Sequence, residues 1–130
     1  PKGVRVALEN HGGLSSTGAE MLRLLDLADH PNVFANYDGG NFALHGEDPV
    51  SAYLLLRGDI GYTHWKGVCA NGDELTACAL GEGIIDWTPV VNGLLADAYD
   101  GYWTLELPEG EGMEAALKRS MEYLREVTGR

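Results

Sequence analysis

Short apolar segments alternate with longer segments whose apolar residues recur every three or four positions. Each apolar segment is bounded by Gly, Asn, Asp or Pro, as is typical of strands buried in a parallel sheet. The predicted strands are Val4–Glu9, Val33–Asp38, Ile60–Lys66 and Tyr102–Leu107. The longer segments predict helices over Gly18–His30, Pro49–Leu56, about 87–99 and Met113–Val127.

Local signals support these helices. Ser15, Ser16 and Thr17 can cap the first helix, and Pro49 follows Asp48 at the first helical position of the second. The alternation of strand and helix favours a parallel sheet with helical crossovers. Two architectures share that order: an open doubly wound sheet, and a (βα)8 barrel of which four units form half. No glycine-rich phosphate loop follows the first strand, which disfavours the nucleotide-binding open sheets.

Composition changes the functional expectations more than the fold. The 130 residues suffice for a single domain, but a complete (βα)8 barrel needs about 250. With 20 acidic and 9 basic residues the net charge is −11, which disfavours nucleic-acid and membrane partners. An excess of carboxylates instead suits a hard cation.

The two cysteines fall in a segment predicted to be a loop. Cys69 and Cys78 have eight residues between them, and no secretory segment is evident. We therefore expect free thiols and a cytoplasmic location. A structural zinc site is disfavoured because it needs four ligands and no second cysteine pair exists.

Chemically capable residues stand at the carboxyl end of every predicted strand. Glu9 ends the first, Asp38 the second and Glu106 lies in the last, while His64 stands near the end of the third. Singly, each has an ordinary explanation, such as turn chemistry for Asp38 before two glycines. In a parallel fold, however, these ends share one edge, where active sites lie.

Three carboxylates at one edge repel each other unless a cation lies between them. Glu9, Asp38, His64 and Glu106 are therefore predicted to be metal ligands. The set is rich in oxygen, which suits one Mn²⁺, Mg²⁺ or Co²⁺ ion and leaves coordination positions for substrate oxygens.

Five short motifs stand in order along the chain: LENH (Leu8–His11), NYDGGN (Asn36–Asn41), THWKG (Thr63–Gly67), LGEGIIDW (Leu80–Trp87) and YWTLELPE (Tyr102–Glu109). Together they resemble the xylose isomerase-like sugar phosphate isomerase/epimerase superfamily. The resemblance implies a (βα)8 TIM-barrel type fold, with residues 1–130 as a single domain that forms the last four βα units. The missing N-terminal half-barrel, or a second copy of the chain, is then the expected partner.

The resemblance also implies a reaction. The four ligands of the family's divalent metal match the four residues named above, and Glu9 and Glu106 match its acid–base pair. A metal-stabilised enediolate of a small sugar or keto-sugar would be the route to isomerisation or epimerisation. His11, Asn41 and Lys66 are candidate substrate-binding residues.

The chain departs from the family pattern at two of these positions. Asn41 stands where a histidine is common, and Lys66 follows the metal histidine where an arginine lies further on in many members. Three alternatives therefore stay open. They are a lyase resembling inosose dehydratase, a metal-binding half-barrel without turnover, and a DNA-repair endonuclease of the same barrel type. The endonuclease is disfavoured because it needs a basic groove and more than the four histidines present.

Overall fold

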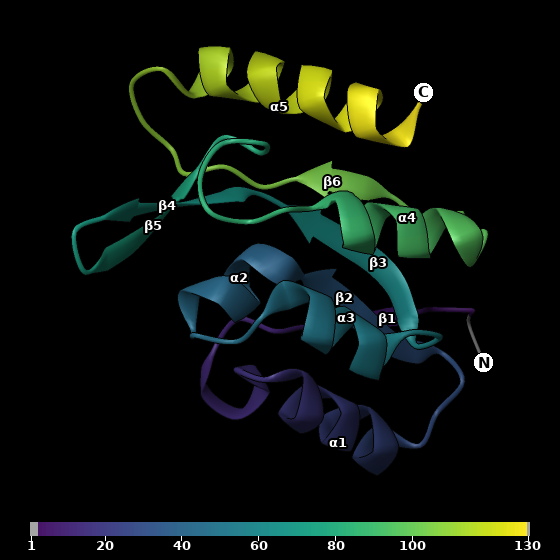
Figure 1. Ribbon diagram of the computed structural model, residues 1–130. Helices are drawn as coiled ribbons and strands as arrows, with labels where there is room; N and C mark the ends of the chain where they lie inside the picture. The colour runs from purple at the N-terminus through teal and green to yellow at the C-terminus, as the bar shows by residue number, and fades with distance from the viewer. Residues whose placement is uncertain (1–2, 130) are drawn as a thin grey trace.

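A four-stranded parallel sheet forms the centre of the protein, for which a computed structural model describes residues 3–129 (Figure 1). Its strands are β1 (Val6–Glu9), β2 (Val33–Asp38), β3 (Ile60–Trp65) and β6 (Trp103–Leu105), paired in that order. Each strand is parallel to its neighbour. All four predicted strands are confirmed, β2 with the predicted bounds and the others with ends that differ by at most two residues.

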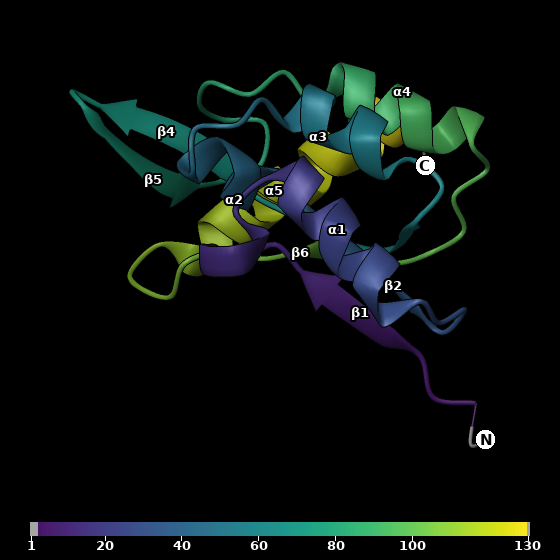
Figure 2. The same ribbon diagram turned by 90° about the horizontal axis from the view of Figure 1, so that it is seen from below.

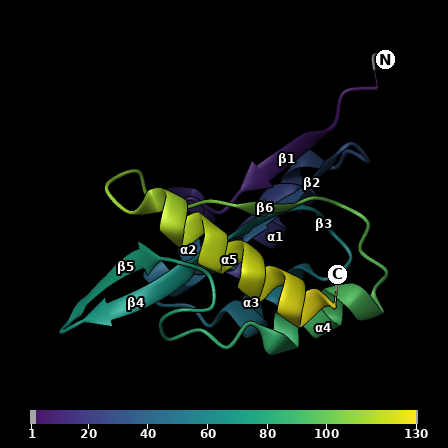
Figure 3. The ribbon, with the colours of Figure 1, turned by 90° about the horizontal axis from the view of Figure 1, so that it is seen from above.

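The helices form a row along the sheet. They are η1 (Gly13–Ser15), α1 (Gly18–Ala28), α2 (Gly39–Leu44), α3 (Pro49–Leu56), α4 (Thr88–Ala96) and α5 (Met113–Thr128). α1 packs against α3, α3 against α4 and α4 against α5. α1 and α5 therefore lie at opposite ends of the row, at the bottom and top of Figure 1, and Figure 3 shows α5 from above. The arrangement is the TIM-barrel-like α/β fold that was expected, present as half of a barrel.

Capping residues set where the predicted helices begin. Thr17 and Glu20 form a capping box at α1, in which each side chain accepts a hydrogen bond from the other residue's backbone. Asp48 accepts the Ser51 N–H at 2.9 Å and caps α3, with Pro49 in its first turn. Such caps satisfy the N–H groups that a helix start leaves unpaired.

The two faces of the sheet differ in exposure. Ala35, Tyr37, Thr63 and Trp65 point towards the helices and are each 0% exposed. Alternate residues such as Tyr62 and His64 point the other way and are partly exposed. Figure 2 shows the sheet from β1, with α1 lying across it. The partly exposed face corresponds to the interior of a complete barrel.

An unpredicted hairpin follows β3 directly. β4 (Gly67–Asn71) and β5 (Glu74–Cys78) are antiparallel, and the hairpin projects to the left in Figure 1. Gly72 adopts a positive φ of 64° in the turn. The two-residue loop Gly72-Asp73 is a hairpin signal in the sequence that the loop prediction overlooked.

The expectation of free thiols was wrong. Cys69 and Cys78 lie on the two strands of this hairpin with their Cα atoms 5.9 Å apart, and they form a disulfide. Strand pairing brings the cysteines within bonding range, which a loop would not ensure. The expectation of a cytoplasmic location rested partly on free thiols, and the disulfide removes that support. In the part of the chain described, no helix has both the length and the apolar character needed to cross a membrane.

Candidate metal centre

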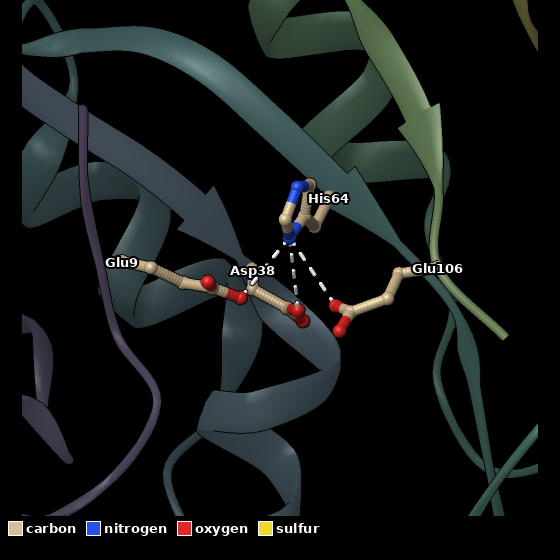
Figure 4. Close-up of side chains that lie close together, drawn as sticks. All are labelled: Glu9, Asp38, His64 and Glu106. Atoms are coloured by element: carbon tan, nitrogen blue, oxygen red, sulfur yellow. Dashed lines mark hydrogen bonds and ion pairs between the residues drawn. The ribbon is translucent and has the colours of Figure 1, made fainter. Parts of the chain in front are cut away.

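The four predicted ligands meet at the carboxyl edge of the sheet. Glu9, Asp38, His64 and Glu106 each offer one ligand atom, and these four atoms all lie within 4.8 Å of one another (Figure 4). The first three residues lie in β1, β2 and β3, and Glu106 directly follows β6. Residues that are up to 97 positions apart in the chain thus converge because the strands are parallel and paired in chain order.

The imidazole lies at the centre of the cluster. His64 Nδ1 is 3.0 Å from Glu9 Oε1, 3.2 Å from Glu106 Oε2 and 4.0 Å from Asp38 Oδ2. Dashed lines mark these contacts in Figure 4. One nitrogen thus faces three carboxylates, so a cation among these atoms would have four donors.

Asp38 is the buried member of the set, at 0% exposure. Its Oδ1 accepts the Asn41 N–H at 2.9 Å, whereas the buried Oδ2 lies 3.0 Å from the Lys66 ammonium and 4.0 Å from His64 Nδ1. Burial raises the pKa of Asp38 to about 6, although the nearby Lys66 charge and the Asn41 N–H act in the opposite direction. A buried carboxylate oxygen that already faces a positive charge and an imidazole nitrogen fits a cation ligand. Three oxygens and one nitrogen fit Mn²⁺, Mg²⁺ or Co²⁺.

Asn10 fixes the relative position of the first two ligands, a role that the sequence analysis did not assign. It is 1% exposed. Its Nδ2 donates to the Asp38 carbonyl at 2.7 Å, and its Oδ1 accepts the Asp38 N–H at 2.9 Å. This double hydrogen bond joins the end of β1 to the end of β2. Its place directly after Glu9 was the only signal available.

Asn36 is a second supporting residue, beside the imidazole. Its Nδ2 lies 3.3 Å from His64 Nδ1 and 3.4 Å from Nε2, and its buried Oδ1 has no described partner. A 180° turn of this amide would bring Oδ1 to the ring. There it could accept the N–H that Nε2 carries when Nδ1 binds a metal.

Two of the three candidate substrate-binding residues border the cluster. Lys66 Nζ lies 3.0 Å from Asp38 Oδ2, 2.8 Å from Glu106 Oε2 and 3.1 Å from Asn41 Oδ1. Burial alone would lower the pKa of Lys66, but the Asp38 charge and the hydrogen bond to Glu106 raise it overall. His11 is exposed directly after β1 and makes no side-chain hydrogen bond to any described residue. The structure thus brings Asn41 and Lys66, but not His11, into contact with the ligands.

The pair Gly39-Gly40 has a packing explanation. A Cβ on Gly40 would lie 2.3 Å from Lys66 Cγ, and one on Gly39 would lie 2.6 Å from Trp87 Cζ3. Asp38 also caps α2 through the Asn41 N–H. The turn chemistry expected at Asp38 is therefore present, and it coexists with a place in the cluster.

The family is decided by its sequence model. The model described as the xylose isomerase-like TIM barrel matches residues 1–127. The chain belongs to this family. The resemblance inferred from five motifs is thus confirmed over nearly the whole chain.

Curated relatives of this family member include dehydratases. The inosose dehydratase of Lacticaseibacillus casei is 28% identical over 120 aligned positions, which cover 80% of this chain and 40% of that protein. The inosose dehydratase of Geobacillus thermodenitrificans is also 28% identical, covering 98% of this chain and 49% of that protein. The chain thus spans less than half the length of these curated relatives.

Solved structures agree on the fold. The probable 3-DHS dehydratase AsbF from Bacillus anthracis superposes with a TM-score of 0.75 at 26% identity, covering 92% of this chain and 48% of that one. A D-tagatose 3-epimerase-like protein superposes with a TM-score of 0.75 at 25% identity, covering 98% of this chain and 49% of that one. A xylose isomerase-like TIM barrel protein from Mycobacterium smegmatis, solved in complex with magnesium, superposes with a TM-score of 0.81 at 18% identity. The superposition covers 98% of this chain and 45% of that one. These similar proteins include both dehydratases and epimerases, so the family is enzymatic but its reactions vary.

Proposed function

We propose that this chain carries the divalent-metal site of an isomerase or epimerase acting on a small sugar or keto-sugar. The convergence of four donor atoms from four strands within 4.8 Å is the observation that supports it. Family membership adds support, because similar proteins include an epimerase-like structure and one crystallised with magnesium.

Glu9, Asp38, His64 and Glu106 would hold the ion, with Asp38 buried and Glu9 and Glu106 more exposed. The side chains of these two glutamates are 28% and 40% exposed, against 0% for Asp38. A bound Mn²⁺, Mg²⁺ or Co²⁺ ion would polarise the substrate's oxygens and acidify the proton beside its carbonyl. Glu9 and Glu106 are the carboxylates that substrate can reach, from opposite edges of the sheet. One would remove that proton and the other would return one.

Asn41, Lys66 and His11 are proposed to orient the substrate. The buried Asn41 Nδ2 has no described hydrogen-bond partner, which leaves it a donor for a substrate hydroxyl. Lys66 offers a positive charge beside it. His11, exposed directly after β1, is proposed as a further contact for the substrate.

A dehydratase is the second candidate, favoured by the names of the curated relatives. Proteins from Lacticaseibacillus casei and Geobacillus thermodenitrificans are both inosose dehydratases. The same proton abstraction would then be followed by loss of a hydroxyl from the adjacent carbon, as water. A glutamic acid in its protonated form could supply the proton that the leaving hydroxyl needs.

We also propose that another half-barrel completes the site. The chain covers 40% and 49% of the two relatives' lengths, and Tyr102 on the open face is 74% exposed. A preceding segment of a longer chain is the favoured partner, and a second copy of this chain is the other. A chain that sediments as a stable monomer would count against the need for either.

Metal binding is the direct test of the site. Calorimetric titration of the chain with Mn²⁺ should show one site per chain, and Glu106→Gln should bind roughly 10–100-fold more weakly because a charged ligand is lost. Glu109→Gln is the matched control, since Glu109 is an exposed glutamate three residues further on. Equal affinity in the Glu106 and Glu109 variants would contradict the site.

The reaction is tested separately in D₂O with Mn²⁺. Deuterium gained by a keto-sugar without loss of mass as water supports an isomerase or epimerase. A dehydrated product from inosose supports the lyase. Metal binding without either product would leave a metal-binding half-barrel without turnover.

A further inference from the structure

One lysine is buried against the carboxylate cluster. Lys66 is 6% exposed, and its Nζ lies within 3.1 Å of oxygens of Asp38, Glu106 and Asn41. A buried ammonium needs hydrogen-bond partners, because transferring an unpaired charge out of water costs much free energy. Three close oxygens supply them.

The ammonium contacts the same oxygens that a metal would use. Asp38 Oδ2 and Glu106 Oε2 are the atoms paired with Lys66, and they also face His64 Nδ1 at 4.0 and 3.2 Å. A divalent ion and the lysine therefore act on two shared donors.

The surrounding chain is shaped to admit this side chain. Gly40 leaves space for the Lys66 stem, since a Cβ there would lie 2.3 Å from Cγ and 2.9 Å from Cδ. Lys66 itself stands between β3 and β4, so its backbone is held by strands on both sides. The position of the ammonium is thus fixed by packing as well as by charge.

We infer that Lys66 is an internal counter-ion, which holds Asp38 and Glu106 together in the metal-free protein and competes with the divalent ion for them. The inference rests on the proposed function in taking the four-residue cluster as a metal site. Without a metal, the single ammonium offsets repulsion among three carboxylates. With a metal bound, the same positive charge lies beside the ion and weakens its binding. Lys66 is in this sense a positioning residue for the ligands.

Replacing Lys66 by methionine separates these two effects. Lys66→Met keeps a long unbranched side chain and removes the charge. Lys118→Met is the control, because Lys118 is an exposed lysine on α5 that pairs with Glu114 at 2.7 Å. Each protein is titrated with MnCl₂ by calorimetry, and its thermal unfolding is followed by circular dichroism in EDTA and in Mn²⁺.

Lys66→Met should bind Mn²⁺ about tenfold more tightly than the unsubstituted chain. Its melting temperature in EDTA should fall, because the buried Asp38 carboxylate loses its counter-charge. The rise in melting temperature on adding Mn²⁺ should exceed that of the unsubstituted chain. Lys118→Met should change none of these quantities.

The other results also decide for or against the role of Lys66. Equal or weaker Mn²⁺ binding by Lys66→Met, with binding intact in the unsubstituted chain, overturns the role of the lysine and leaves the metal site standing. No binding by either protein overturns both. If Lys66→Met is unfolded in EDTA, Lys66→Gln, which keeps a donor without the charge, is measured in the same way. Folding of these variants in Mn²⁺ alone supports the inference, and failure to fold in either condition overturns it.

Discussion

The two faces of the central sheet differ in the environment of their side chains. On the helix side, Tyr37 and Trp65 are fully buried, and they pack with residues of α3 and α4 in one apolar cluster. On the other side, His64 and Tyr62 are partly exposed and are linked to polar neighbours. Because side chains alternate along a strand, adjacent residues such as His64 and Trp65 belong to different environments.

We expect the helix side to determine stability and the open side to determine metal binding. Burial of apolar surface drives folding, so the helix side should carry most of the free energy of unfolding. Three clustered carboxylates oppose folding and have the single Lys66 ammonium to offset their charge, so the open side should carry the smaller part of this free energy in the metal-free protein. Substitutions of apolar residues on the helix side should therefore lower stability and leave metal affinity unchanged.

The largest effect is expected in the apolar cluster. Leu56 on α3 is 0% exposed, and Leu56→Ala should lower the free energy of unfolding by about 3 kcal/mol through lost burial and a cavity. Urea unfolding measures it. Mn²⁺ affinity of the folded variant should stay within about twofold, because Leu56 belongs to the apolar cluster, which contains none of the four ligands.

Leu54→Ala is the matched control on the same helix. Leu54 is 59% exposed, so its truncation should cost less than about 0.5 kcal/mol. Similar losses for Leu54 and Leu56 would mean that the helix side is not the stabilising face.

Asn10→Ala should lower both stability and metal affinity, with a smaller loss of stability than Leu56→Ala. The buried amide holds the backbone N–H and C=O of Asp38, so its loss leaves two buried polar groups without partners. We expect about 1–2 kcal/mol less stability and, because Glu9 and Asp38 lose their mutual alignment, roughly tenfold weaker Mn²⁺ binding. Calorimetry and urea unfolding on one preparation give both numbers. Asn92→Ala, at an exposed position of α4, should change neither, and unchanged metal affinity in Asn10→Ala would remove its role in aligning the ligands.

Much of this arrangement could be predicted because parallel strands obey simple rules. The apolar segment Val33–Asp38 coincides with β2, and Asp38 therefore had to lie at the same edge as Glu9 and His64. The ligand cluster followed from strand direction alone. Long-range contacts could not be predicted in this way. The two hydrogen bonds between the Asn10 side chain and the Asp38 backbone depend on the register between β1 and β2, which no local sequence pattern encodes.

The errors have local physical causes. The hairpin of β4 and β5 lies outside the main sheet, so it interrupts the alternation of strand and helix that guided the prediction. The Cys69–Cys78 disulfide follows from that missed pairing. α2 was missed because its sequence, beginning with Gly39-Gly40, has low helix propensity, and Asp38 starts it by capping.

The smallest effect is expected at the exposed start of α3, on the helix side. Asp48 accepts hydrogen bonds from the Ser51 hydroxyl and N–H, and these lower the pKa of its carboxyl. Asp48→Ala should therefore lower the free energy of unfolding by about 1 kcal/mol at pH 7, with Mn²⁺ affinity unchanged.

The pH dependence of this loss identifies its origin. A carboxyl whose pKa is lower in the folded state stabilises the fold above its unfolded pKa of about 3.9, and the stabilisation disappears as the pH falls through the folded value. The difference between the unsubstituted chain and Asp48→Ala should hence shrink in urea unfolding at about pH 3. Asp100→Ala, at an exposed position outside any helix, is the control for removal of an aspartate that caps no helix. A loss at Asp48 that stayed constant with pH would mean that the negative charge of the cap does not contribute to stability.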